Sequence, residues 1–250
     1  MRYFILMIQF FTRIPIRINV LAEEKDFSKG LPYFPLVGLV IGIFNYLAFY
    51  IFSYLGEGLL PIVFWLLANI VVTGAIHIDG LADTCDGLLS ARSRERMLEI
   101  MKDSRIGTNG VIAIVMDLLI RLAFMFSLYP SIRPFVIILS PIVGKSFALM
   151  LIWISSYARK NGGMGGLFYS DISKLHVVLG LLSGALMVSL VYSWKLLLVL
   201  IPCLIFILIY RRFVINKIDG MTGDTLGAAN ELAEICFMGF ICVFERLGYL

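Results

Sequence analysis

Long apolar segments alternate with short polar segments along the whole chain. A helix needs about 20 apolar residues to cross the hydrocarbon core of a bilayer. We interpret seven segments as membrane spans: 31–55, 59–78, 111–128, 134–155, 175–192, 196–210 and a last apolar helix that ends near Leu250. The apolar segment 4–14 is too short to span, so we expect it to lie in the membrane interface or to dip into the bilayer and return.

This pattern predicts the fold class. We expect an all-α integral membrane protein, a single polytopic domain over residues 1–250 with a bundle of about seven transmembrane helices, an interfacial N-terminal segment and no sheet. Gly38 and Gly42 are four residues apart, a spacing that lets two helices approach closely. The helix of 59–78 is expected to continue past the membrane surface through Leu89, and 211–230 to form a polar loop before the last helix.

The composition supports a membrane protein and argues against a soluble domain or a nucleic-acid-binding protein. The chain is 60% hydrophobic and 15% charged, with a mean hydropathy of +0.93, whereas soluble domains are about half apolar and a quarter charged. The net charge of +4 indicates no nucleic acid partner, because membrane topology itself requires basic loops. The four cysteines have no metal-ligand spacing, so we expect free thiols.

The basic residues predict the orientation. Sixteen of the 21 Lys and Arg residues fall in the segments 1–30, 79–110, 157–174 and 211–230. Lys and Arg are enriched in cytoplasmic loops. We therefore expect these segments, with the functional residues they carry, to face the cytoplasm.

The segment 73–110 carries a cluster of acids in an otherwise apolar chain. On a helix with about 100° per residue, Asp79, Asp83 and Asp86 fall within roughly 60° of one another. Hard carboxylate oxygens without Cys or His partners favour Mg²⁺, with substrate phosphate completing its coordination. The alternative is a solvated acidic helix face, which the flanking glycines and the neighbouring apolar run make less attractive.

Basic and glycine residues follow the acids in the same segment. Arg92, Lys102 and Arg105 offer donors for phosphate oxygens. Gly107 lies just before the next span, whose N-terminal N–H groups favour an anion. We therefore predict substrate phosphate binding here; lipid headgroup anchoring by the arginines is the alternative.

A second polar block occupies 217–234. Its candidate functional residues are Thr222, Gly223, Asp224, Thr225 and Glu231. The topology places it on the same face as 73–110, so we expect Asp224, supported by Thr225 and Glu231, to lie within metal or hydrogen-bond reach of the aspartate cluster. A glycine-rich turn with a helix cap is the simpler reading of part of this block.

Charged residues also occur within the spans. Asp117 and Arg121 are four residues apart, and Lys145 lies midway along another span. Charges at this depth are costly and usually face a bundle interior or an aqueous cavity. A structural Asp117–Arg121 pair is one possibility; an anion-contacting role for Arg121 or Lys145, with Arg121 binding substrate phosphate, is the other. His77 fits a packing residue, and the glycine-rich segment 161–168 fits a flexible loop able to close over a ligand.

Several motifs together resemble the adenosylcobinamide-GDP ribazoletransferase family, also called cobalamin synthases. They are HIDGLADTCDG, SARSRERMLEIMKDSRIGTNG and GMTGDTLGAANELAE, with FFTRIPI and FPLVGLVIG near the start. The resemblance implies an Mg²⁺-dependent enzyme of cobalamin (vitamin B12) biosynthesis in the bacterial or archaeal cytoplasmic membrane. Its substrates would be adenosylcobinamide-GDP and α-ribazole or α-ribazole 5′-phosphate, and GMP would leave. An oligomer is compatible with the sequence.

Phosphoryl transfer requires a group that accepts the proton of the attacking hydroxyl, and Asp83 and Asp224 are the two candidates. The motif DTCDGLLSAR also resembles the CDP-alcohol phosphotransferases. In that family two residues separate the glycine from Ala-Arg, whereas Leu88, Leu89 and Ser90 intervene here, and the family's Gly-x-x-x-Asp-x-x-x-Asp tail is missing. An ion-coupled transporter is the rival from another class, but its acids would lie near mid-membrane.

Overall fold

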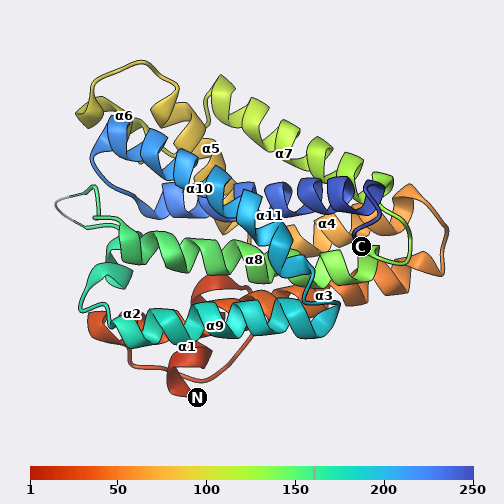
Figure 1. Cartoon of the computed structure of the whole chain (residues 1–250). Coiled ribbons are helices and arrows are strands. Elements are labelled where there is room, and N and C mark those ends of the chain that lie inside the picture. The colour runs from red at the N-terminus through yellow and green to blue at the C-terminus, as the bar shows by residue number, and fades with distance from the viewer. Residues whose placement is uncertain (160–161) are drawn as a thin grey trace.

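The chain folds into a bundle of helices in a computed structural model that describes residues 1–159 and 162–250 (Figure 1). The α-helices are α1 (Arg2–Phe11), α2 (Glu24–Gly30), α3 (Phe34–Ser53), α4 (Leu59–Thr73), α5 (Ile76–Leu88), α6 (Arg94–Ile100), α7 (Thr108–Ser127), α8 (Arg133–Ile154), α9 (Lys174–Val191), α10 (Leu196–Ile218) and α11 (Gly223–Arg246). Two 3₁₀ helices, η1 (Leu31–Tyr33) and η2 (Met164–Tyr169), complete the described elements. Within the described ranges the one β feature is an isolated bridge between Tyr157 and Met221.

The predicted all-α membrane class is confirmed. Six helical segments are long and apolar enough to cross a bilayer, and the bent pair α4–α5 would make a seventh if it forms one span. Apolar side chains such as Leu119, Leu182 and Ile209 are exposed on the outer helices α7, α9 and α10. A bilayer would cover such side chains.

Helix α8 lies at the centre of the bundle and α3 packs closely along it. An added β-carbon at Gly38 would meet the backbone of Pro141 and Ile142, and one at Gly42 would meet the backbone of Ile138. The close approach predicted from the glycine spacing is thus confirmed, because only a residue without a side chain fits at these two crossing points.

The second apolar segment does not form the continuous helix expected through Leu89. Its two parts, α4 and α5, meet at a bend of 88°. Gly74 and Ala75 at the break have φ values of 62° and 61°. Because residues in this left-handed region cannot continue a right-handed helix, the chain turns sharply and α5 leaves the direction of α4. The turn brings α5 against α11.

The prediction of a long polar loop over 211–230 is also wrong. Helix α10 continues to Ile218 and α11 already begins at Gly223. Thr222 and Thr225 form a capping box at the start of α11, in which each side chain accepts the backbone N–H of the other. Most of the second polar block is therefore the first two turns of a helix.

The polar connections gather at one end of the bundle, on the left in Figure 1, where α2, α6 and the α10–α11 turn lie. The guanidinium of Arg94 ties this end together by donating to the backbone carbonyls of Ala158 and Ile218. Helix α1 contributes Met7 and Phe11 to the protein core. It therefore packs against the bundle rather than lying apart from it.

Candidate active site

Glycines let α5 and α11 cross in direct backbone contact. A β-carbon on Gly80 would lie 2.8 Å from the carbonyl oxygen of Asp224, and one on Gly227 would lie 3.4 Å from the backbone of His77. This crossing joins the two polar blocks, as predicted. As a result Asp79 of α5 and Asp224 of α11 line the same cavity.

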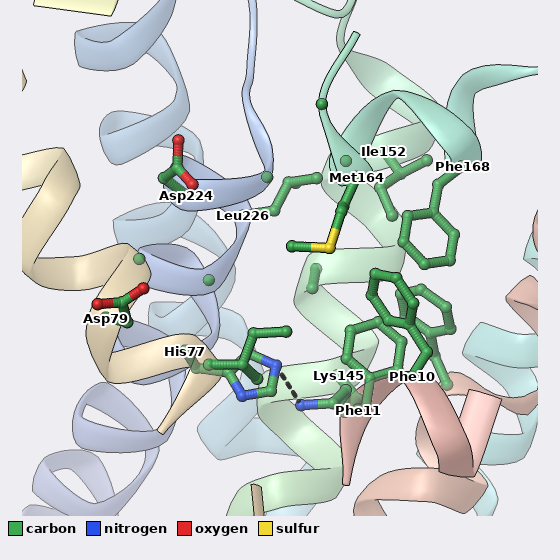
Figure 2. Close-up of a pocket in the computed structure, with 18 of the residues that line it drawn as sticks. Phe10, Phe11, His77, Asp79, Lys145, Ile152, Met164, Phe168, Asp224 and Leu226 are labelled. Carbon is green, nitrogen blue, oxygen red and sulfur yellow. Dashed lines mark hydrogen bonds between the residues drawn. The ribbon is translucent and has the colours of Figure 1, made fainter. Parts of the chain in front are cut away.

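The cavity has a volume of about 380 Å³. It is enclosed mainly by α1, α5, α8, η2 and α11, with one residue of α3. Figure 2 shows the carboxylates of Asp79 and Asp224 on one side and the rings of Phe10, Phe11 and Phe168 on the other. A pocket with apolar walls and a few convergent polar groups is the usual form of a small-molecule site.

Asp224 is held by Arg159, which belongs to no recognisable sequence motif. Arg159 Nη2 donates to Asp224 Oδ2 at 2.7 Å, and both residues line the cavity. The Nε atom of Arg159 is buried without a hydrogen-bond partner in the described part of the chain. A lone arginine in a polar loop gave no signal in sequence, because its importance comes from the folding of its loop against α11.

Asp86 serves a different purpose from the one predicted. Its carboxylate accepts the N–H of Gly107 at 2.6 Å and that of Gly110 at 2.8 Å. The N-terminus of α7 does attract an anion, as the pattern indicated, but that anion is Asp86. The assignment of Gly107 to substrate phosphate is therefore corrected.

The carboxylates are not gathered into a complete metal site by protein atoms alone. Among the described residues, no three His, Cys, Asp or Glu side chains are placed to hold one ion. Mg²⁺, however, is commonly held by one or two carboxylates together with substrate phosphates and water. Asp79 and Asp83 are one helical turn apart on α5 and form no ion pair in the described chain. Their hard oxygen donors suit Mg²⁺.

The predicted basic residues separate into two groups. Lys102 lines the cavity beside Arg159. Arg105 is 87% exposed and pairs with Asp103 at 2.6 Å; hydrogen bonds from Arg105 lower the pKa of that carboxyl to about 2. Arg92 is exposed and is not part of the cavity wall.

Arg121 belongs to a buried ion cluster. Its guanidinium pairs with Asp117 at 2.9 Å, Glu231 at 2.6 Å and Glu234 at 2.8 Å, and its side chain is 1% exposed. The structural Asp117–Arg121 pair is confirmed. The alternative assignment of Arg121 to substrate phosphate is corrected, because three carboxylates already use its donors. Glu231 likewise supports Arg121 and does not join the aspartates.

The remaining residues of the second block build the start of α11. Thr222 and Thr225 are fully buried and their hydroxyls form the helix cap, so they position Asp224 from within the fold. Gly223 lines the cavity and packs against Gly165 of η2. In the predicted flexible segment, Asn161 lies outside the described residues, whereas Met164 and Phe168 form part of the cavity wall.

Comparisons with a family model and with individual relatives point to the same family. Residues 3–242 match the family described as Cobalamin-5-phosphate synthase. The chain is 50% identical to the adenosylcobinamide-GDP ribazoletransferase of Clostridium novyi (strain NT), with 100% of each chain covered. It is 39% identical to the protein of that name from Clostridioides difficile (strain 630), covering 96% of this chain and 97% of the relative. The relative of that name in Listeria welshimeri is 40% identical, with 98% and 96% covered. No solved structure matches the chain.

Proposed function

This chain belongs to the cobalamin-5-phosphate synthase family, and we propose that the cavity between α5 and α11 is its active site. The protein is an adenosylcobinamide-GDP ribazoletransferase, which joins adenosylcobinamide-GDP with ribazole in cobalamin biosynthesis. The observation that carries the assignment of the site is the meeting of two sequence-distant acidic blocks on one cavity, where Asp79 and Asp224 face an aromatic wall.

The reaction is a phosphoryl transfer. The 3′-hydroxyl of α-ribazole, or of α-ribazole 5′-phosphate, attacks the phosphorus that is attached to the cobinamide. A new P–O bond forms, the P–O bond to GMP breaks, and GMP leaves with the bonding electrons. The products are adenosylcobalamin, or its 5′-phosphate, and GMP, and the hydroxyl proton passes to a carboxylate.

Of the two candidates, Asp224 is the better supported as the group that accepts that proton. It lines the cavity, whereas Asp83 lies one turn further along α5 and is outside the cavity wall. Arg159 now neutralises Asp224. When the diphosphate enters, Arg159 and Lys102 turn their donors to the phosphate oxygens, because a bidentate guanidinium–phosphate contact is strong. Asp224 is then free to act as the general base.

Asp79 and Asp83 are the residues of this chain that would hold Mg²⁺. The fit rests on their oxygen donors, their one-turn spacing on α5 and the absence of an ion-pair partner in the described chain. When bound, Mg²⁺ supplies charge neutralisation to the diphosphate and to departing GMP. Asp86 remains the anion at the N-terminus of α7.

The membrane location also shapes the reaction. The cavity wall includes Lys102, Arg159 and Gly223, which belong to three of the basic segments, 79–110, 157–174 and 211–230. Because Lys and Arg are enriched on the cytoplasmic side, we place this end of the cavity in the cytoplasm. The bundle keeps the corrinoid close to the membrane surface while the phosphates reach the cavity.

The direct test is release of GMP by the purified full-length chain in detergent or liposomes. We expect GMP from adenosylcobinamide-GDP only when α-ribazole and Mg²⁺ are both present, and loss of release in Asp224→Asn. Asp171→Asn is the matched control, since Asp171 is exposed and distant in sequence from both acidic blocks. CMP release from CDP-diacylglycerol, with adenosylcobinamide-GDP untouched, would overturn the assignment.

A further inference from the structure

One end of the cavity is polar and deeply buried. Lys145 Nζ lies 2.8 Å from Asn230 Oδ1 and 3.0 Å from His77 Nε2, and the residue is 1% exposed. Figure 2 shows Lys145 and His77 at the foot of the cavity, below the aromatic side chains. Neither residue takes part in the phosphoryl transfer described above.

The ammonium group retains a donor for a ligand. A lysine ammonium has three N–H groups, and Lys145 has two hydrogen-bond partners in the described residues. Its charge is also near the face of the Phe11 ring, with Nζ 5.2 Å from the ring centre. Lys145 therefore offers a hydrogen-bond donor at the buried end of the cavity.

The walls suit a flat ring system. The ring of His77 is stacked on Phe11 with centres 5.8 Å apart and planes 17° from parallel. Phe11 is also stacked on Phe168, with centres 5.8 Å apart and planes 15° from parallel. Aromatic faces and edges of this kind pack well against another planar aromatic ring.

The two substrates contain three ring systems: the corrin and the guanine of adenosylcobinamide-GDP, and the benzimidazole of α-ribazole. The size and polarity of the cavity distinguish among them. Ligand pockets measure about 300–1,000 Å³, and this cavity of about 380 Å³ is at the small end of that range, which favours a single base over the much larger corrin macrocycle. Guanine has acceptors, O6 and N7, that a lysine can reach, but its ring and amino N–H donors would also need acceptors, and Asn230 Oδ1 and His77 Nε2 at this end already lie against Lys145. A benzimidazole base has one free ring nitrogen that accepts a hydrogen bond, and its remaining edge is apolar.

We propose that this cavity holds the benzimidazole base of α-ribazole, with Lys145 Nζ donating a hydrogen bond to the free ring nitrogen. The inference rests on the proposed function and adds the residues that select the attacking nucleoside. Met164 and Ala148 also line the cavity and limit the width available to the base. With the base held at this end, the ribose points toward Asp224, so that its 3′-hydroxyl reaches the general base.

The test separates the two substrates in steady-state kinetics of GMP release. In Lys145→Met we expect the KM for α-ribazole to rise about 10- to 100-fold, the loss typical of a charge-assisted hydrogen bond, with the KM for adenosylcobinamide-GDP within about twofold of wild type. Ser146→Ala is the matched control, because Ser146 is the next residue on α8 and its hydroxyl bonds the backbone of Ile142. It should change neither KM.

A second variant covers the case in which Lys145→Met fails to fold. Ala148→Leu narrows the cavity, and an extra methylene in an apolar pocket changes selectivity by about 10- to 200-fold. We expect it to raise the KM for α-ribazole more than the KM for the riboside of benzimidazole without its methyl groups. An equal effect on both ribosides would contradict the inference.

Binding without turnover distinguishes this inference from the proposed function. Free 5,6-dimethylbenzimidazole should raise the melting temperature of the wild-type full chain and have less effect on Ala148→Leu. If the wild type binds this base but releases no GMP, the proposed function fails and the base site stands. If GMP binding, and not binding of the base, is lost in the variants, the cavity holds guanine and the inference is wrong.

Discussion

Gly80 on α5 and Asp224 on α11 are in backbone contact: a β-carbon on Gly80 would lie 2.8 Å from the Asp224 carbonyl oxygen. These residues are far apart in sequence, and no side chain separates the two helices at this point. The contact sets the distance between the acids of α5 and the first turn of α11. We regard it as the structural basis of the active site.

The first prediction concerns this contact. Gly80→Ala should lower the melting temperature and reduce the rate of GMP release, because the backbone of Asp224 cannot yield as a flexible side chain would. The gain in helix propensity on replacing glycine, about 1 kcal/mol, acts in the opposite direction and should not compensate. Thermal unfolding and activity assays measure both effects.

Gly56→Ala provides the control for that substitution. A β-carbon there would make only an ordinary contact of 3.5 Å with Leu60. We expect wild-type melting and activity. If Gly80→Ala behaves like Gly56→Ala, the crossing is not closely constrained and the account of how Asp224 is positioned is incorrect.

The second prediction separates the three aspartates of α5. Asp79→Asn and Asp83→Asn should reduce turnover by about 100-fold or more and raise the Mg²⁺ concentration needed for activity. Asp86→Ala should instead lower thermal stability, by about 0.5–2 kcal/mol for a lost helix cap, with an unchanged Mg²⁺ requirement. Magnesium titrations of the three variants give the answer, and equal behaviour of all three would reject this division of roles.

The third prediction concerns Arg159. Arg159→Met should raise the KM for adenosylcobinamide-GDP about tenfold or more, since the variant loses a guanidinium contact to the diphosphate. Arg105→Met should have a much smaller effect, because Arg105 is exposed and paired with Asp103. Kinetics with the nucleotide substrate varied at saturating α-ribazole would show the difference; a larger effect in the Arg105 variant would contradict it.

The fourth prediction concerns the buried ion cluster. Arg121→Met leaves the carboxylates of Asp117, Glu231 and Glu234 without their shared cation. Breaking a buried pair in this way costs about 3–5 kcal/mol. We expect poor recovery of folded protein and a lower melting temperature. A stable variant with a raised KM for adenosylcobinamide-GDP would restore the phosphate-binding role for Arg121.

Much of the fold could be predicted because its signals are local. Apolar length identified the spans, and the spacing of Gly38 and Gly42 indicated a close helix contact that α3 and α8 make. The bend between α4 and α5 could not be predicted from the sequence, because it depends on a left-handed φ of 61° at Ala75. Alanine rarely adopts this conformation, so its presence in the sequence does not indicate a bend. The start of α11 was placed too late because its first turns are polar, although the Thr222–Thr225 cap is a recognisable helix signal.

The site was predictable in part for the same reason. The meeting of Asp79 and Asp224 followed from topology, since both blocks were expected on one face. The partners of individual side chains depended on packing that sequence does not state. Asp86 accepts a hydrogen bond at the N-terminus of α7, and Arg121 pairs with three carboxylates. Arg159, which lies in a loop, pairs with Asp224.

A structure of Asp224→Asn with adenosylcobinamide-GDP, α-ribazole and Mg²⁺ bound tests the central claim most directly. We expect the diphosphate between Asp79 and Arg159, with the ribazole inside the cavity and its 3′-hydroxyl beside residue 224. Phosphates bound on the exposed face around Arg92 and Arg105, with neither substrate entering the cavity, would contradict the account.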